Sequence, residues 1–179
     1  LRAAVLGAND GLISTASLIV GVAAAEPGRE PIMIAALAGM VAGALSMAAG
    51  EYVSVSSQAD TEDAEIDRER KELQEQPEFE RQELAGIYRS RGLTPDLALQ
   101  VADQLMAHDA LGAHARDELG ITEVMRARPL QAAAASAAAF AVGALPVVGI
   151  VWFAPVALIG ALVIAATVAL LAALGSTAA

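Results

Sequence analysis

The sequence predicts an all-α, polytopic membrane helix bundle that is interrupted by a charged helical insert. Of its 179 residues, 56% are hydrophobic but only 3% are aromatic, so small and aliphatic side chains supply the apolarity. This composition is too apolar for an ordinary soluble domain and is typical of membrane helices that pack closely. Residues 59–128 hold 17 of the 21 acidic residues. We therefore expect membrane helices one and two in residues 1–58, the insert in 59–128, and helices three and four in 129–179.

The first apolar segment, residues 2–25, is long enough to cross about 30 Å of hydrocarbon. A carboxylate near mid-membrane costs roughly a few to more than ten kcal/mol unless it is paired or hydrated, so we expect Asp10 to be functional. The structural alternative is a hydrogen bond to a neighbouring serine. Small and polar residues share one face of this helix, which predicts contact with protein or water. These residues are Gly7, Asp10, Ser14, Ser17 and Gly21.

The second apolar segment follows a turn predicted at residues 26–30, with a helix start at Pro31. The helix is expected to continue past Glu51 into solvent. Met47 lies one helical turn before Glu51, and thioether and carboxylate ligands together favour Fe²⁺, Mn²⁺, Co²⁺ or Zn²⁺ over Mg²⁺ and Ca²⁺. The alternatives are ordinary packing for Met47, and a proton carrier or an interfacial acid for Glu51.

The insert is expected to be a small all-α unit, with breaks at Pro77, Gly92 and Gly120. Thr94 is predicted to cap a helix that has proline at its first position. The expected helices cover residues 59–76, 78–91, 95–107 and 109–119.

Glutamates recur at helical spacing in the insert. Glu69 and Glu72 lie within a narrow arc, Glu65 is a further candidate on the same arc, and Glu80 and Glu83 repeat the spacing after Pro77. Carboxylates this close repel each other unless a cation lies between them, which suggests a metal site. The alternative is a solvated acidic face that pairs with Arg68, Arg70 and Lys71.

His114 and Glu118 are four residues apart, a spacing that can grip a metal ion, although a surface histidine is the simpler alternative. The absence of cysteine excludes thiolate zinc sites and iron–sulfur clusters. The net charge of −10 argues against nucleic acid as a partner. The sequence shows no Ser-His-Asp set, no phosphate loop and no Rossmann glycine pattern, so none of these motifs indicates an enzyme.

Residues 129–179 contain no Asp, Glu, Lys or Arg, and they are too numerous for one span. Pro146 and the WFAP stretch at 152–155 are expected to divide them into helices at 129–151 and 155–174. Nine of the 11 Lys and Arg residues lie in 59–128. The positive-inside bias therefore predicts a multi-pass protein of the cell membrane with its N-terminus and insert in the cytoplasm.

Three stretches, NDGLIST (9–15), ALSMAAGEYVSVSSQ (44–58) and RPLQAAAASAAAFAVGALP (128–146), resemble the vacuolar iron transporter family in its bacterial branch. The resemblance implies a homodimer with five membrane helices and a cytoplasmic metal-binding domain between helices two and three. Members of the family move ferrous iron, and often manganese, out of the cytosol, commonly in exchange for protons. Because four spans are visible, we expect the family's last helix to lie outside this sequence.

The resemblance also implies roles for individual residues. Asp10 and Met47 correspond to positions that line the transport path. His114 and Ala115 stand where plant relatives have two methionines. The family's insert ligands match Glu69, Glu72, Glu80, Glu83 and Glu118.

The sequence therefore predicts a transporter that exports Fe²⁺ or Mn²⁺, with Zn²⁺ and Co²⁺ as further candidates and no fixed cofactor. Protonation of Asp10 or Glu51 would release the metal on the far side. The expected partners are the lipid bilayer, metal ions, protons and a second copy of the chain. The first alternative is a membrane-anchored iron sensor or buffer without transport. An intramembrane enzyme that uses the same two acids ranks last.

Overall fold

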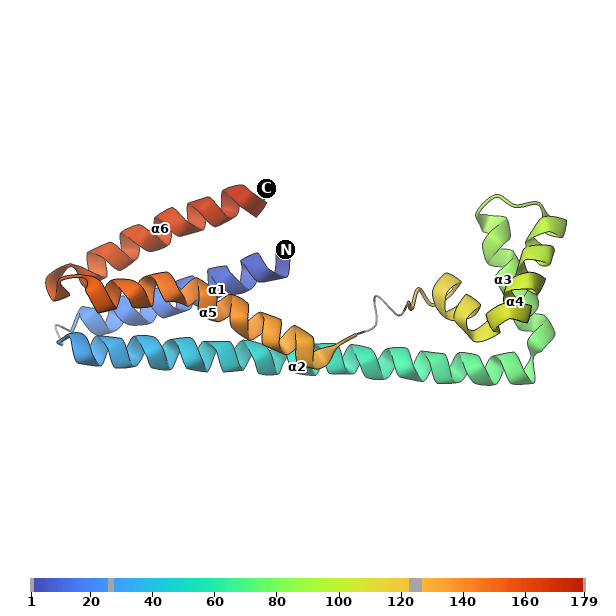
Figure 1. The fold of residues 1–179 in the computed structure, drawn as a ribbon, viewed down its shortest axis with the longest axis horizontal. Coiled ribbons are helices and arrows are strands. Elements are labelled where there is room, and N and C mark those ends of the chain that lie inside the picture. Colours follow the sequence, from blue (N-terminus) through green and yellow to red (C-terminus); the bar gives the residue numbers. More distant parts are fainter. Residues whose placement is uncertain (1, 26–27, 123–126, 179) are drawn as a thin grey trace. The chain divides into compact units, whose positions relative to one another are not determined.

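The computed structural model describes residues 2–25, 28–122 and 127–178. Within these ranges the chain forms six α-helices and one short 3-10 helix, so the predicted all-α fold is confirmed (Figure 1). The chain divides into two compact units, residues 1–54 with 129–179, and residues 55–128. These limits lie near the expected boundaries at 58/59 and 128/129.

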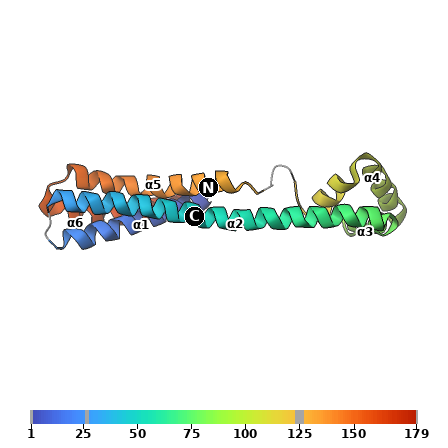
Figure 2. The same cartoon turned by 90° about the horizontal axis from the view of Figure 1, so that it is seen from below.

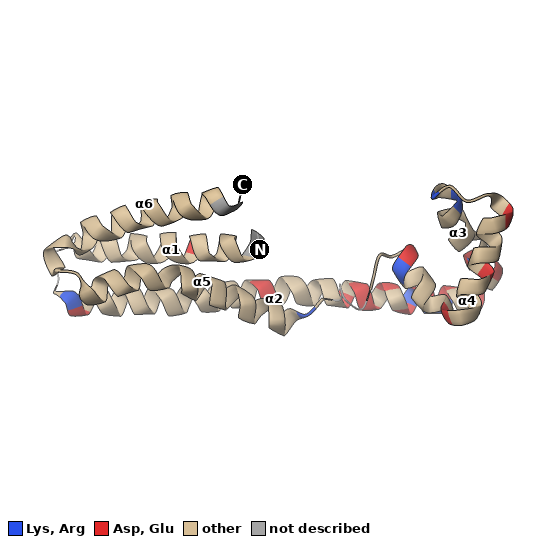
Figure 3. Ribbon diagram, turned by 45° about the horizontal axis from the view of Figure 1, so that its top comes forward, with Lys and Arg blue, Asp and Glu red and all other residues tan. Residues whose placement is uncertain are grey.

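Four helices of the described chain are long and apolar enough to cross a membrane. They are α1 (Arg2–Ala23), α2 (Arg29–Glu75), α5 (Pro129–Phe153) and α6 (Ile159–Ala178), which a 3-10 turn η1 (Val156–Leu158) precedes. Charged side chains are rare on α1, α5 and α6 and frequent on the insert helices (Figure 3). The expected membrane helix bundle with four spans is therefore present.

The packing of α1 against α5 depends on small residues, and the two helices lie side by side in both views (Figures 1 and 2). A Cβ atom at Gly11 would lie 2.0 Å from the Phe140 carbonyl oxygen, and one at Gly143 would lie 2.0 Å from that of Ala8. The Phe140 ring, 2% exposed, occupies the space left by Gly43 on α2. Glycine thus permits a backbone approach that a larger residue would block.

The start of α2 differs from the prediction. The helix begins at Arg29 rather than at Pro31, so residues 29 and 30, which were predicted to belong to the turn, are helical. Residues 26–27 of the predicted turn lie outside the described ranges. The Arg29 guanidinium donates hydrogen bonds of 2.5–2.6 Å to three carbonyl oxygens at the end of α5. A cation that binds these carbonyls stabilises a helix C-terminus. The acceptors belong to Val151, Trp152 and Ala154.

Pro146 does not divide the last apolar region, because α5 continues through it and ends at Phe153. Proline removes one backbone donor, but neighbouring helices allow it inside membrane helices. The division lies at the WFAP stretch, as predicted. Trp152 is 64% exposed and Phe153 is 84% exposed, which suits aromatic residues at a membrane interface.

The insert consists of the second part of α2, α3 (Pro77–Ser90) and α4 (Pro95–Asp117). The predicted turns are present at Gly92, with φ of 101°, and at Gly120, with φ of 70°. Asp109 interrupts α4 with non-helical torsions, as the predicted break before residue 109 requires, and its carboxylate accepts a bond from the Gly112 N–H. Thr94 precedes α4 as predicted, but its side chain makes no capping hydrogen bond. An apolar core joins α3 to α4 through Leu84, Ala85, Ala98, Ala102 and Ala113.

Candidate metal centre

Three helices of the insert bring four ligand-type side chains together. The Nδ1 atom of His114 on α4 lies 3.0 Å from a Glu69 oxygen on α2 and 3.8 Å from a Glu80 oxygen on α3. The same nitrogen donates a hydrogen bond of 2.8 Å to Glu118. One ligand atom from each residue lies within 4.8 Å of all the others. We call these four residues the carboxylate–histidine group.

Local sequence explains how α4 supplies two members of the group. His114 lies between Ala113 and Ala115, whose small side chains are also buried and allow close packing around the imidazole. Glu118 follows one turn later as the C-cap residue, and its N–H donates to the His114 carbonyl oxygen at 2.9 Å. The spacing of four residues therefore places both side chains on one face of the helix end.

The group is buried although it is acidic. The side chains of His114, Glu69 and Glu80 are 0%, 1% and 4% exposed, and that of Glu118 is 23% exposed. Burial, followed by the neighbouring charge of Glu118, raises the pKa of Glu69 to about 7. Burial and the charge of Glu83 raise the pKa of Glu80. Both shifts show that the metal-free site disfavours the charged carboxylates.

Several buried polar atoms of the group lack hydrogen-bond partners among the described residues. They are the Nε2 atom of His114 and both carboxylate oxygens of Glu69, one of which lies 3.0 Å from the His114 Nδ1 atom without forming a hydrogen bond. Buried polar groups in proteins are normally satisfied, and each exception calls for an explanation such as an ion. Imidazole nitrogen and carboxylate oxygen are common ligands of divalent transition metals. The residues present therefore fit a divalent cation.

The other glutamates predicted in the insert lie outside the group. Glu72 is 38% exposed at its side chain and lies 3.7 Å from Arg68, as in the solvated-face alternative. Glu83 is exposed, and Glu65 is partly exposed on α2. The charges of Glu72 and Glu83 still contribute to the raised pKa of Glu80. The surface alternative for His114, in contrast, is wrong because its side chain is fully buried.

The residues that were predicted to line the transport path lie on the membrane helices α1 and α2. Asp10 is exposed on α1, and its carboxylate accepts a bond of 2.7 Å from the Ser14 hydroxyl on the same helix. This bond corresponds to the structural alternative. Met47 on α2 lies beside α1, since a Cβ atom at Gly7 would be 3.5 Å from the Met47 methyl carbon. Glu51 is exposed on α2.

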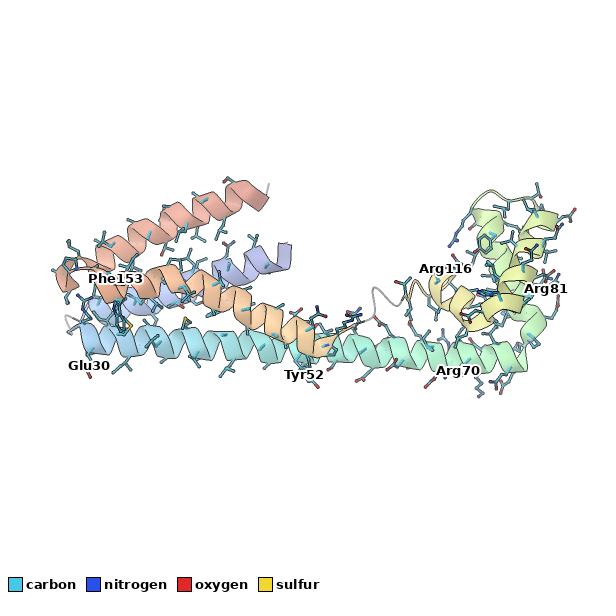
Figure 4. All side chains as sticks on the ribbon, in the orientation of Figure 1. Glu30, Tyr52, Arg70, Arg81, Arg116 and Phe153 are labelled. Atoms are coloured by element: carbon cyan, nitrogen blue, oxygen red, sulfur yellow. The ribbon has the colours of Figure 1, made fainter. Side chains whose placement is uncertain are left out.

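Sequence reasoning missed a second polar cluster, which lies at the end of α4. Asp117 there binds Tyr88, Arg91 and Arg116. Figure 4 labels Arg116, the member of this cluster that lies on α4. These residues form no recognisable motif in the sequence, because they lie at the ends of two different helices. The only hint in the sequence is that the charged residue Asp117 directly precedes the candidate ligand Glu118.

Fold and site together define a polytopic helical membrane protein with a ligand-type group in an inserted helical unit. Comparison with known proteins identifies the family more narrowly. The family model described as "VIT family" matches residues 1–179, and the chain belongs to this family.

Curated relatives agree with the family assignment. The chain is 50% identical over 153 residues to a vacuolar iron transporter of Acanthamoeba castellanii, which covers 85% of this chain and 56% of that protein. It is 61% identical over 70 residues to vacuolar iron transporter homolog 1 of Oryza sativa, covering 39% of this chain and 30% of the relative. Vacuolar iron transporter homolog 2 of Arabidopsis thaliana is 55% identical over 76 residues, or 42% of this chain and 39% of the relative. The chain thus spans about half or less of each relative.

Proposed function

We propose that this chain belongs to a transporter that moves a divalent transition metal, Fe²⁺ or Mn²⁺, out of the cytosol. The carboxylate–histidine group carries the proposal, because burying the carboxylates of Glu69 and Glu80 is costly unless a cation compensates their charge. The names of the relatives support iron as the transported ion. The chemistry of the ligands also suits Zn²⁺ and Co²⁺.

In this proposal the insert lies in the cytoplasm and binds the ion first. The ion then passes Asp10 and Met47 within the membrane, and Glu51 acts as a further ligand or a proton carrier. The position of Met47 beside α1 supports a shared path on these two helices. Carboxylates within the membrane support exchange for protons, which would compete with the metal for Asp10.

A second copy of the chain would complete the path. The stripe of α1 that carries Asp10 and Ser14 is exposed in the single chain. Farther along the stripe, Ser17 and Gly21 line an open groove of about 560 Å³ between α1 and α6. A polar stripe on a membrane helix normally faces protein or water rather than lipid, which supports a homodimer in the cell membrane.

The direct test is metal uptake by proteoliposomes that contain the wild-type chain or Asp10→Asn. Asp10→Asn keeps the shape of the side chain but removes the charge, so uptake of Fe²⁺ or Mn²⁺ should fall at least about tenfold. Ser14→Ala, which removes only the hydrogen bond to Asp10, is the matched control and should retain most of the uptake. Uptake that ignores an opposing pH gradient would show that proton exchange is wrong.

The second candidate function is a membrane-anchored iron sensor or buffer. The bond between Asp10 and Ser14 favours it, because this bond gives the intramembrane carboxylate a structural role. Under this alternative, the wild-type chain binds metal in the insert, but neither the wild-type chain nor Asp10→Asn takes metal up into the proteoliposomes. The same uptake experiment therefore separates the two functions.

A further inference from the structure

An ionic cluster surrounds Asp117, the residue that precedes Glu118 at the end of α4. The Asp117 carboxylate accepts hydrogen bonds from the Tyr88 hydroxyl at 2.8 Å, from Arg91 at 2.7 Å and from Arg116 at 2.6 Å. Arg91 also donates to the Asp117 carbonyl oxygen at 3.2 Å, and its guanidinium lies 5.2 Å from the centre of the Tyr88 ring. The Asp117 side chain is 9% exposed. Hydrogen bonds to an ionised acceptor are stronger than neutral ones, and the Asp117 carboxylate is largely shielded from water although the Arg91 and Arg116 side chains are 47% and 52% exposed.

The cluster joins the two helices that hold most of the candidate ligands. Tyr88 lies on α3, the helix that carries Glu80, whereas Asp117 is the last residue of α4. The turn from His114 to Glu118 is closed by backbone bonds from the N–H groups of residues 118 and 119 to the His114 carbonyl oxygen. Attaching Asp117 to α3 therefore fixes the position of the whole turn relative to Glu80.

The turn needs such an attachment because the group opposes its own assembly. One oxygen from each of Glu69, Glu80 and Glu118 lies within 4.8 Å of the others, and like charges this close repel, so the repulsion is relieved if Glu118 moves away. Glu118 is also the most exposed member of the group and has water available as an alternative. The bonds of Asp117 oppose that movement without entering the group themselves.

We propose that Asp117 is a positioning residue for metal binding, which holds His114 and Glu118 against the ligands of α2 and α3 through Tyr88 and Arg91. This inference rests on the proposed function, since it assumes that the carboxylate–histidine group binds the ion. Asp117 itself is not a member of the carboxylate–histidine group.

The chain provides a matched control. Arg81 on α3 forms an ion pair with Asp103 on α4, so this pair also links the two insert helices. Asp103 lies eleven residues before His114, away from the turn that carries the ligands. Asp103→Asn and Asp117→Asn therefore make the same chemical change at the same helix pair, but only the second affects the ligand turn.

The test is titration of the full chain in detergent with Co²⁺ alone, followed by visible absorption and calorimetry. Relative to wild type, Asp117→Asn should weaken Co²⁺ binding about tenfold or more, as outer partners of metal ligands do. Tyr88→Phe removes one hydrogen bond and should weaken it about threefold. Asp103→Asn should change it less than about twofold. At saturating Co²⁺, the absorption band of Asp117→Asn should also differ from that of wild type, which loss of stability alone would not cause.

The outcomes separate the two proposals. Equal Co²⁺ affinity and equal spectra for Asp117→Asn and Asp103→Asn would overturn the positioning role, whereas a wild-type chain that binds no Co²⁺ would overturn the proposed function. If Asp117→Asn does not fold, Tyr88→Phe decides: weaker binding at an unchanged helical signal supports the inference, and unchanged binding overturns it.

Discussion

At the scale of single residues, the unusual feature of this protein is a carboxylate that is buried without a hydrogen bond. Glu69 is 1% exposed, and neither of its oxygens accepts a hydrogen bond in the described part of the chain, although one of them lies 3.0 Å from the His114 Nδ1 atom. Such a side chain destabilises the metal-free fold and is kept only if another interaction compensates. Its neighbours on α2 show the contrast, since Glu72 lies near an arginine at the surface.

Glu69→Gln should weaken Co²⁺ or Fe²⁺ binding at least about tenfold, because it replaces a charged ligand by a neutral one of the same shape. It should also stabilise the metal-free chain, since the buried charge is removed. Glu65→Gln, the same change one turn earlier on α2, should alter neither property appreciably. Calorimetric titration and thermal unfolding by circular dichroism measure the two effects, and equal losses of affinity in both variants would contradict the assignment of the site.

The stability of the metal-free chain should depend on pH through Glu69. Its pKa is raised from 4.5 to about 7 in the folded state, so the folded chain binds this proton more tightly than the unfolded chain. The stabilisation is therefore fully present below about pH 4.5 and is lost as the pH rises through 7, by up to about 3 kcal/mol. Asp117, whose pKa is about 2, stays ionised throughout this range and adds no slope.

Thermal unfolding in the presence of a chelator, at pH 5 and pH 8, tests this dependence. Wild type should be less stable at pH 8, and Glu69→Gln should show a smaller difference between the two pH values. A wild-type chain that becomes more stable between pH 5 and pH 8 would show that Glu69 does not control this range.

At the scale of helices, the contact between α1 and α5 sets a strict limit on side-chain size. Gly143→Ala would bring a methyl group to about 2.0 Å from the Ala8 carbonyl oxygen, so the helices must separate. We expect a loss of a few kcal/mol, about 1–3, as for other overpacked sites. Gly149→Ala on the same helix meets nothing within 4 Å and should be neutral. Thermal unfolding in detergent compares the two variants, and equal melting temperatures would contradict this packing.

At the scale of the whole molecule, the division into two compact units predicts where bound metal should stabilise the chain. The carboxylate–histidine group lies entirely within residues 55–128. Ligand binding stabilises the folded unit by mass action, by about 2.7 kcal/mol at a hundredfold excess over Kd. Hydrogen exchange with and without Co²⁺ should therefore show slower exchange in α3 and α4 and little change in α1 and α5. Slower exchange in α1 and α5 of the same size would contradict independent units.

Much of this arrangement could be predicted from the sequence. Long uncharged stretches identify membrane helices, and proline and glycine mark the turns of the insert, because both signals act locally. Burial in the insert could not be predicted, since it depends on which faces of three helices meet. Glu69 and Glu72, like Glu80 and Glu83, are three residues apart, and the sequence does not show that only Glu69 and Glu80 join the group. No residue near His114 in the sequence indicates that its side chain is buried.

Two further features show the same limit. Pro146 was expected to help divide the last apolar region because proline ends helices in water, whereas α5 continues through it. The sequence contains no motif for Asp117, because its partners, Tyr88 on α3 and the C-cap residue Arg91, lie 29 and 26 residues away in the chain. Interactions of this kind become visible only when the helices are placed beside each other.

The contact at Gly11 and Gly143 also restricts how the membrane unit can change shape. A Cβ atom at either position would lie 2.0 Å from a carbonyl oxygen of the other helix, so sliding the helices would bring residues with side chains into a space that admits only glycine. If the chain transports metal as proposed and alternates between an inward-open and an outward-open form, we expect α1 and α5 to move together as one rigid unit. A covalent cross-link between these two helices should then leave the transport cycle intact.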